Sequence, residues 1–150
     1  MPIIQQSVVI DAPINEVYRV ARDVEKFPEF MEDLQSLVIQ ERSPDNTRTV
    51  TAWVGLIRDF KMTIKWTQED LWDDTHYKDD FKMLHGDMDK MEGLWQFTAE
   101  SPNHTRFDST VDYEYDVPLI GAMVKNLIKK KMTDNLQATM DAIKTKAEGR

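Results

Sequence analysis

The sequence predicts an α+β domain in which a curved antiparallel sheet of seven strands packs against one long C-terminal helix. Three observations predict this fold class. The chain begins with a short β-branched stretch, its middle part from Gln35 to Asp116 alternates apolar and polar residues between turn signals, and apolar residues recur at helical spacing after Pro118. The chain has 150 residues and no linker-like segment, so we expect a single domain over 1–150.

The first expected strand is IIQQSVVI at 3–10, because β-branched residues favour strands. In the segment DAPINEVYRVARD that follows, Asp11 is a candidate N-cap, Pro13 fits a position near the start of a helix, and apolar residues recur at helical spacing. This segment therefore predicts a helix. Because Pro28 disfavours helix at Phe27, a second short helix is expected to begin there.

Six antiparallel strands are expected between Gln35 and Asp116. Turn-forming residues interrupt the alternating pattern, and each interruption is too short for a parallel crossover. The interruptions are SPDNT at 43–47, the region 55–59, WDDT at 72–75, HGDMDK at 85–90 and SPNHT at 101–105. The six strands are therefore expected to follow one another as a meander.

A long helix is expected after Pro118. Apolar residues recur there with a period near 3.6, whereas the lysines mostly lie off this stripe. The stripe consists of Ile120, Met123, Val124, Leu127, Met132, Leu136, Met140 and Ile143. One helix about 10 Å wide cannot cover the concave face of seven strands, so we expect a cavity between the sheet and this helix.

Composition excludes several classes of function. The formal net charge of −8 argues against a surface that binds the phosphates of nucleic acid. The absence of cysteine excludes disulfides, thiolate zinc sites and Cys nucleophiles, and it fits a reducing compartment. No signal peptide is visible and no stretch approaches the roughly 18 apolar residues of a membrane span, so we expect a cytoplasmic protein.

Several segments together resemble a known superfamily. They are VVIDAPINEVYRVARDVEKFPEFM near the start, the strand GLWQFT, the turn SPNHTRF, the strand DSTVDYEYDVP and the final AIKTKAE. These segments are similar to the helix-grip, START-like (SRPBCC) superfamily, and within it to the polyketide cyclase/dehydrase and coenzyme Q-binding branch. The resemblance implies the helix-grip fold, and its members bind lipids, quinones or hormones, cyclise polyketides, or bind partner proteins.

Alternation along the strands gives candidate cavity residues, because successive side chains point to opposite faces. The last strand has one largely apolar face with Phe107, Ser109, Val111, Tyr113 and Tyr115. Aromatic side chains on such faces fit either a packed core or a ligand-lining wall. The residues that we expect to contact a ligand are Met62, Ile64, Trp66, Tyr77, Phe81, Trp95, Phe97, Tyr113, Tyr115, Met123 and Leu127.

Three polar residues are candidates for catalysis, namely His85, Asp79 and Arg58. Alternation places both Asp79 and His85 on the inner face with aromatic residues. There His85 would be suited to proton transfer near neutral pH, and Asp79 would have a shifted pKa. Each also has a structural explanation, since His85 and Arg58 fit solvated positions at strand ends and Asp79 fits an edge or a bulge. Cyclases of the resembling family are described with an inner-strand arginine and tyrosine, whereas the body of the matching strand here is apolar, which weakens the enzyme interpretation.

We expect binding or transport of a small hydrophobic or aromatic ligand, such as a lipid, quinone or polyketide-like molecule, in the internal cavity. Two alternatives remain, a polyketide aromatase/cyclase that catalyses cyclisation and dehydration, and a protein-interaction module. No cofactor is expected. No metal site is expected either, because DMDKME at 87–92 lacks the length and central Gly of a calcium loop and the three histidines are scattered along the chain.

The C-terminal helix is also a candidate for transient contact with a membrane or a protein. Residues 118–150 carry seven Lys or Arg and three Asp or Glu, against 12 and 24 in residues 1–117. The lysines concerned are Lys125, Lys129, Lys130 and Lys131. Their charge fits either an electrostatic contact with an acidic partner or anionic lipid, or a solvated helix face.

Overall fold

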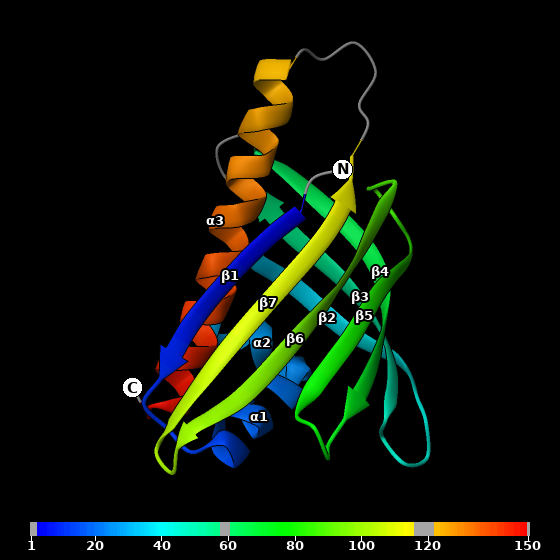
Figure 1. The fold of residues 1–150 in the computed structure, drawn as a ribbon. Coiled ribbons are helices and arrows are strands. Elements are labelled where there is room, and N and C mark those ends of the chain that lie inside the picture. The colour runs from blue at the N-terminus through cyan, green and yellow to red at the C-terminus, as the bar shows by residue number, and fades with distance from the viewer. Residues whose placement is uncertain (1–2, 58–60, 116–121, 150) are drawn as a thin grey trace.

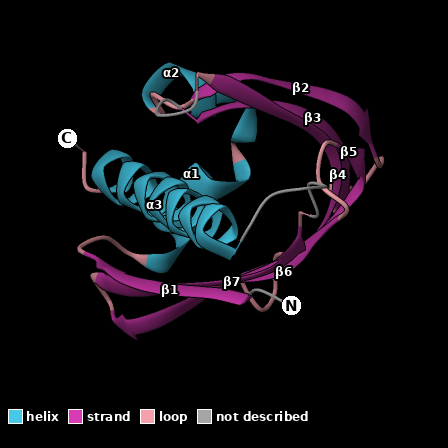
Figure 2. Ribbon diagram, turned by 90° about the horizontal axis from the view of Figure 1, so that it is seen from above, coloured by secondary structure: helices cyan, strands magenta, loops and turns pink. Residues whose placement is uncertain are grey.

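The computed structural model describes residues 3–57, 61–115 and 122–149, and it confirms the predicted fold class. Seven antiparallel strands form one curved sheet, and α1 and α3 lie inside its curve (Figure 2). The elements are β1 (Ile3–Ile10), α1 (Ile14–Arg22), a 3₁₀ turn (Val24–Lys26), α2 (Phe27–Phe30), β2 (Leu34–Arg42), β3 (Arg48–Ile57), β4 (Met62–Asp73), β5 (Lys78–Gly86), β6 (Lys90–Ser101), β7 (His104–Glu114) and α3 (Ala122–Ala147).

The strands lie in the order β1-β7-β6-β5-β4-β3-β2. The six strands β2 to β7 form the predicted meander, and β1 pairs with β7, with Ile4 opposite Val111 and Val8 opposite Phe107. The chain therefore passes from one edge of the sheet to the other between β1 and β2, and α1 and α2 lie on this passage (Figure 1).

Irregularities in the ladders bend the sheet. Register shifts occur twice between β2 and β3, once between β4 and β5, and once between β6 and β7. Such shifts increase the local twist and turn a strand away from its partner. The consequence is a sheet that curves around α1 and α3 (Figure 2).

Helix α1 begins directly after Pro13, whose extended backbone makes it the N-cap without a side-chain hydrogen bond. The predicted cap at Asp11 is therefore wrong. The Asp11 backbone N–H instead donates to Glu148 Oε2 at 2.8 Å, which joins the start of this segment to the end of α3. The second helix begins at Phe27, as predicted.

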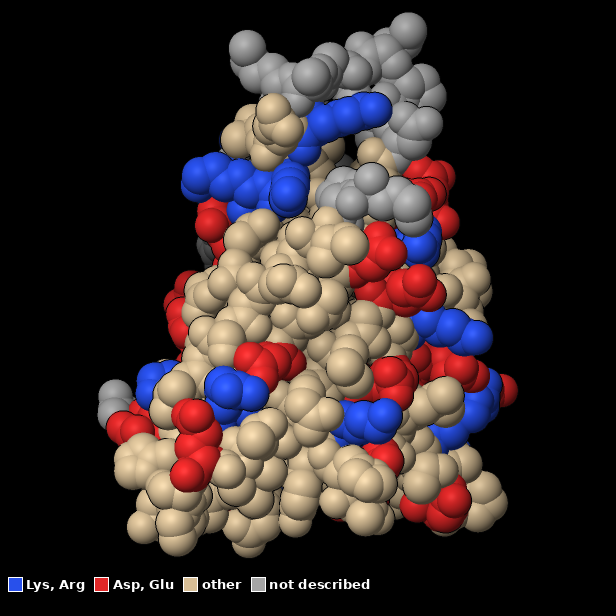
Figure 3. All heavy atoms as spheres, viewed as in Figure 1, with Lys and Arg blue, Asp and Glu red and all other residues tan. Residues whose placement is uncertain are grey.

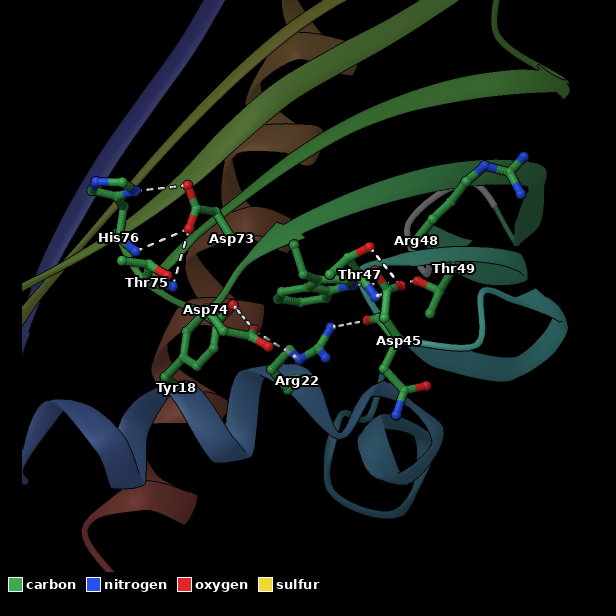
Figure 4. Close-up of polar contacts among 12 residues, drawn as sticks. Tyr18, Arg22, Asp45, Thr47, Arg48, Thr49, Asp73, Asp74, Thr75 and His76 are labelled. Atoms are coloured by element: carbon green, nitrogen blue, oxygen red, sulfur yellow. Dashed lines mark hydrogen bonds and ion pairs between the residues drawn. The ribbon is translucent and has the colours of Figure 1, made fainter.

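Hydrogen bonds join helix α1 to two hairpin turns at one end of the sheet (Figure 4). Tyr18 Oη donates to Asp74 Oδ1 at 2.7 Å, and Arg22 Nη1 donates to the backbone oxygen of Asn46 at 2.8 Å. The guanidinium of Arg22 also lies 4.9 Å from the ring centre of Trp72. These contacts hold α1 across one end of the concave face.

Helix α3 packs most tightly near its C-terminus. Among the side chains of α3 that the structure describes, Met140, Ile143 and Ala147 are buried, whereas those of residues 125–139 are exposed or half-buried. Lys144 Nζ donates to the backbone oxygen of Val9 at 2.8 Å and ties this end to β1. Among the described residues, no helix is long and apolar enough to cross a bilayer.

Candidate ligand-binding site

A cavity of about 580 Å³ lies between α3 and the concave face of the sheet. This volume is within the range of about 300–1,000 Å³ that is typical of small-molecule sites. Strands β3 to β7 form one wall, the segment from Val24 to Leu34 forms a second, and the part of α3 from Met132 to Lys146 forms a third. The space predicted from the width of a single helix is therefore present.

Aromatic rings make up much of the wall. All four tryptophans of the chain line the cavity, namely Trp53, Trp66, Trp72 and Trp95. Trp53 on β3 lies opposite Trp66 on β4, and the two rings stack with centroids 5.5 Å apart. Trp95 meets Phe81 edge-on at 6.4 Å. Such rings supply large apolar contact area to a ligand.

Three of the indole N–H groups are bonded to neighbouring side chains of the same wall. The pairs are Trp53 with Thr51 at 2.7 Å, Trp66 with Gln68 at 2.7 Å and Trp72 with Thr49 at 3.3 Å. Inner-face side chains of β3 and β4 thus satisfy the polar edges of these rings. The ring faces that are not covered by a neighbouring ring or by Arg22 remain for contact with a ligand.

A pair of buried carboxyl groups, Asp70 on β4 and Asp79 on β5, interrupts the apolar wall. Gln68 Nε2 donates to Asp70 Oδ1 at 2.8 Å, and a side-chain hydrogen bond joins Asp70 to Asp79. The two residues are 4% and 1% exposed. We refer to them as the carboxyl pair.

Burial sets the protonation of the carboxyl pair. It raises the pKa of Asp70, and it raises the pKa of Asp79 well above the ordinary value, with the negative charge of Asp70 as a second cause. Two adjacent carboxylates in a dry site cannot both ionise cheaply, so the pair retains a proton. The two carboxyl groups therefore share one proton.

Exposed charged and polar residues of the cavity wall lie on α3 and on the segment that joins α2 to β2. The wall includes the exposed Asp141, Thr145 and Lys146 on α3 and the exposed Glu32 on the facing segment. Lys146 Nζ lies 5.9 Å from the ring centre of Phe30. The exposed part of the wall therefore carries charged groups, while the buried part is largely aromatic.

The basic residues predicted for surface contact lie on α3 before the part that lines the cavity. Lys125, Lys129 and Lys130 are exposed and Lys131 is half-buried. Lys130 pairs with Asp134 at 3.2 Å. Figure 3 shows Lys and Arg side chains gathered around the N-terminal part of α3, near the top of the view.

Four of the predicted ligand contacts line the cavity, namely Ile64, Trp66, Phe81 and Trp95. The side chains of Met62 and Met123 lie outside the described part of the structure. The remaining five predicted contacts do not line the cavity. This corrects the predicted position of Tyr77, Phe97, Tyr113, Tyr115 and Leu127.

Packing of α1 explains two of these corrections. Tyr18 of α1 meets Tyr77 edge-on at 5.2 Å and Phe97 edge-on at 5.8 Å, and Phe97 also stacks on Phe107 at 4.4 Å. Tyr77 lies in the turn before β5, with a φ of 54°, and not in the strand. Helix α1 thus covers the inner face at this end of the sheet and excludes the cavity from it.

The other three residues lie outside the cavity wall, each in a different environment. Tyr113 is buried in the core at the end of β7, and Tyr115 is half-buried after that strand. Leu127 belongs to the predicted apolar stripe of α3 but is 39% exposed, because this part of the helix stands away from the sheet core.

The three catalytic candidates are not brought together. Asp79 lies in the cavity wall, whereas Arg58 is outside the described residues. The inward orientation predicted for His85 is wrong. The register shift that pairs Thr67 with His85 and Gln68 with Met83 leaves Leu84 extra on β5, and both Leu84 and His85 are exposed.

Sequence reasoning missed part of the wall. Gln68, Asp70 and Trp72 continue the inner face that begins with Ile64 and Trp66, because β4 runs on to Asp73. Interpreting the segment WDDT as a turn ends the predicted strand too early. Extending the same alternation by three positions would have found both Asp70 and Trp72.

The sequence between residues 10 and 140 matches the family model described as polyketide cyclase / dehydrase and lipid transport. The chain belongs to this family. No relative is found among curated proteins. The lipid transport in the description of this family agrees with the presence of an aromatic cavity here.

Solved structures share the fold over nearly the whole chain. The protein TTHA0849 from Thermus thermophilus is 29% identical, with a TM-score of 0.90 and 97% of each chain covered. Zhui aromatase/cyclase from Streptomyces sp. R1128 is 16% identical, with a TM-score of 0.89 over 98% of this chain and 93% of that chain. A START superfamily protein from Mycobacterium smegmatis is 18% identical, with a TM-score of 0.82 and 97% of each chain covered. The chain therefore has the helix-grip fold.

Proposed function

We propose that the chain binds a small hydrophobic or aromatic molecule, such as a lipid, quinone or polyketide-like compound, in the cavity under α3. The observation that carries this proposal is the space of about 580 Å³ lined by all four tryptophans. Burial of apolar ligand surface contributes about 25 cal/mol per Å² before the costs of association are subtracted. The wall offers rings for such contact and few competing polar groups.

The tryptophans allow a direct test with 2-methoxynaphthalene, an uncharged bicyclic probe. In ¹H–¹⁵N NMR spectra, saturable shifts of the four indole N–H signals are expected during titration, because every tryptophan lines the cavity. Gly55 also lines the cavity, and a Cβ there would lie 3.5 Å from Trp66 Cζ3, an ordinary contact. Gly55→Leu should therefore fill the space and weaken binding by more than tenfold.

Gly55→Ala is the matched control for this variant, because it adds one methyl group at the same position and should change affinity far less. Unshifted indole signals with the unmodified chain would contradict the proposal. Equal affinity of Gly55→Leu and the unmodified chain for the probe would place the probe outside the cavity. That result would also contradict the proposal.

A second candidate function is polyketide cyclisation and dehydration. The observation that favours it is the carboxyl pair in the wall, because a carboxyl group that retains its proton is able to protonate a substrate oxygen during loss of water. With a poly-β-ketone substrate, Asp79→Asn should slow turnover by about 10² or more, the usual size of general acid catalysis. Asp80→Asn, at the exposed neighbour on β5, is the control.

Unchanged turnover in Asp79→Asn would contradict the catalytic role.

The proposed carrier function includes transient contact of Lys125, Lys129, Lys130 and Lys131 with an acidic surface. Sedimentation with phosphatidylcholine vesicles, with and without phosphatidylserine, tests that contact. Binding that does not depend on the anionic lipid would argue against it.

A further inference from the structure

The fourth tryptophan of the wall differs from the other three at its polar edge. Trp53, Trp66 and Trp72 each donate the indole N–H to a neighbouring side chain, whereas no described residue accepts a hydrogen bond from Trp95 Nε1. Trp95 is nevertheless only 8% exposed. The N–H of a buried tryptophan usually has a partner, so this one points to a partner that the protein itself does not supply.

The unpartnered N–H group is open to the cavity. Trp95 lies on β6 and lines the cavity. Its nitrogen is not one of the fully enclosed, unpartnered side-chain atoms in the described part of the chain, so a molecule the size of water can reach it. Asp79 and Ser109, which lie opposite Trp95 on β5 and β7, do not accept from it. The donor is therefore available to a molecule in the cavity.

Packing of neighbouring rings holds the Trp95 side chain in place. The ring meets Phe107 edge-on with centres 5.1 Å apart and Phe81 edge-on with centres 6.4 Å apart. Phe27 lies at 6.4 Å between ring centres as well. A ring held by three others loses little conformational freedom when a ligand binds, so the donor is preorganised.

The chemistry of the indole group defines what it recognises. An indole N–H is a donor only, so its partner on the ligand must be an acceptor. The wall contains the carboxyl pair, and its basic residue within the described part of the chain, Lys146, is exposed. An anionic acceptor would therefore be buried without a compensating charge, which costs far more than burying a neutral polar group. A neutral carbonyl oxygen meets both conditions.

We propose that Trp95 Nε1 donates a hydrogen bond to a carbonyl oxygen of the cavity's ligand, so that the site selects aromatic carbonyl compounds over hydrocarbons of the same shape. The inference rests on the proposed binding function and narrows its ligand class. A hydrocarbon that fills the cavity covers this N–H without bonding to it, whereas a carbonyl oxygen completes its hydrogen bonding.

The test compares 2-acetylnaphthalene with 2-isopropenylnaphthalene, which has nearly the same shape but a CH₂ group in place of the carbonyl oxygen. Dissociation constants for both probes are measured by NMR with the unmodified chain and with Trp95→Phe, which keeps an aromatic ring but removes the N–H donor. The ratio of the two constants should shift by about tenfold against 2-acetylnaphthalene in Trp95→Phe, as expected for one buried hydrogen bond.

Trp53→Phe is the matched control, because it removes the same part of a ring from the same wall, whereas the N–H that it removes already donates to Thr51. The loss of contact area should weaken the binding of both probes alike and keep their ratio. An unchanged ratio in Trp95→Phe, or an equal shift of the ratio in both variants, overturns the inference while leaving the proposed function intact. Failure of the unmodified chain to bind either probe overturns the proposed function itself.

The indole N–H signals of the unmodified chain give a result that does not depend on the folding of a variant. The Trp95 signal, identified by through-space contacts with the Phe107 ring, should lie further downfield with 2-acetylnaphthalene bound than with 2-isopropenylnaphthalene bound, because a hydrogen bond to oxygen deshields the proton. The signals of Trp53, Trp66 and Trp72 already have partners and should respond alike to the two probes. An identical response of the Trp95 signal to both probes overturns the inference.

Discussion

Asp79 shows how burial changes the behaviour of a single carboxyl group. Its pKa lies well above the ordinary value because the side chain is desolvated and because Asp70 is beside it. Folding therefore takes up a proton at Asp79 between the ordinary pKa of about 4 and the raised pKa of the folded state. The stabilisation from this proton is complete at acid pH and is lost as the pH rises through the folded-state pKa.

Asp79→Asn should therefore flatten the pH dependence of stability. The Asn amide is neutral at every pH and still donates to Asp70, so the variant avoids the cost of ionising a buried acid. Urea unfolding between pH 5 and pH 8 measures the effect. The slope of the free energy of unfolding against pH should change by at most about 1.4 kcal/mol per pH unit, the value for one proton. Asp80→Asn removes only a lesser cause of the raised pKa of Asp79, so it should change the slope much less than Asp79→Asn does. An unchanged slope in Asp79→Asn would refute the explanation.

Within the strands, Gly93 on β6 marks a place where the backbone passes too close to its neighbours for a side chain. A Cβ there would press against the carbonyl oxygen of Thr110 and would lie 2.7 Å from Phe81 Cζ. Phe81, directly opposite Gly93 on β5, lines the cavity in the space that the missing side chain leaves.

Gly93→Ala should lower the free energy of unfolding by about 1–3 kcal/mol, the usual cost of overpacking. Urea unfolding measures it, with Gly55→Ala as the control, because the Cβ at Gly55 makes only ordinary contacts. If both variants lost the same stability, the cost would come from backbone entropy and not from the close approach to Thr110.

Local sequence patterns predicted the strands and helices well. They did not predict which parts of the inner face of the sheet line the cavity. Alternation and turn residues depend on neighbours in sequence, and they predicted the meander of six strands, the short helix at Phe27 and the long C-terminal helix. The burial of Phe97 under Tyr18 depends on where α1 packs, and the exposure of His85 depends on one extra residue in β5. Neither effect leaves a periodic signal in the sequence.

The molecule as a whole should gain stability from an occupied cavity. A ligand that binds only the folded state at ten times its dissociation constant contributes about 1.4 kcal/mol. For a domain of this size, that corresponds to a rise in Tm of about 3–6 °C. Differential scanning calorimetry with 2-methoxynaphthalene measures the rise, which should disappear in Gly55→Leu. A Tm that does not respond at this concentration would contradict the cavity as the binding place.

The uneven burial of α3 also bears on how a guest molecule enters. Met140, Ile143 and Ala147 hold the last turns against the protein, and Lys144 secures them to β1, whereas residues 125–139 have no fully buried side chain. Amide hydrogen exchange should consequently be slowest in the last turns and faster through residues 125–139. The outer turns of α3 can therefore move with less loss of packing than the last turns, which stay attached to β1.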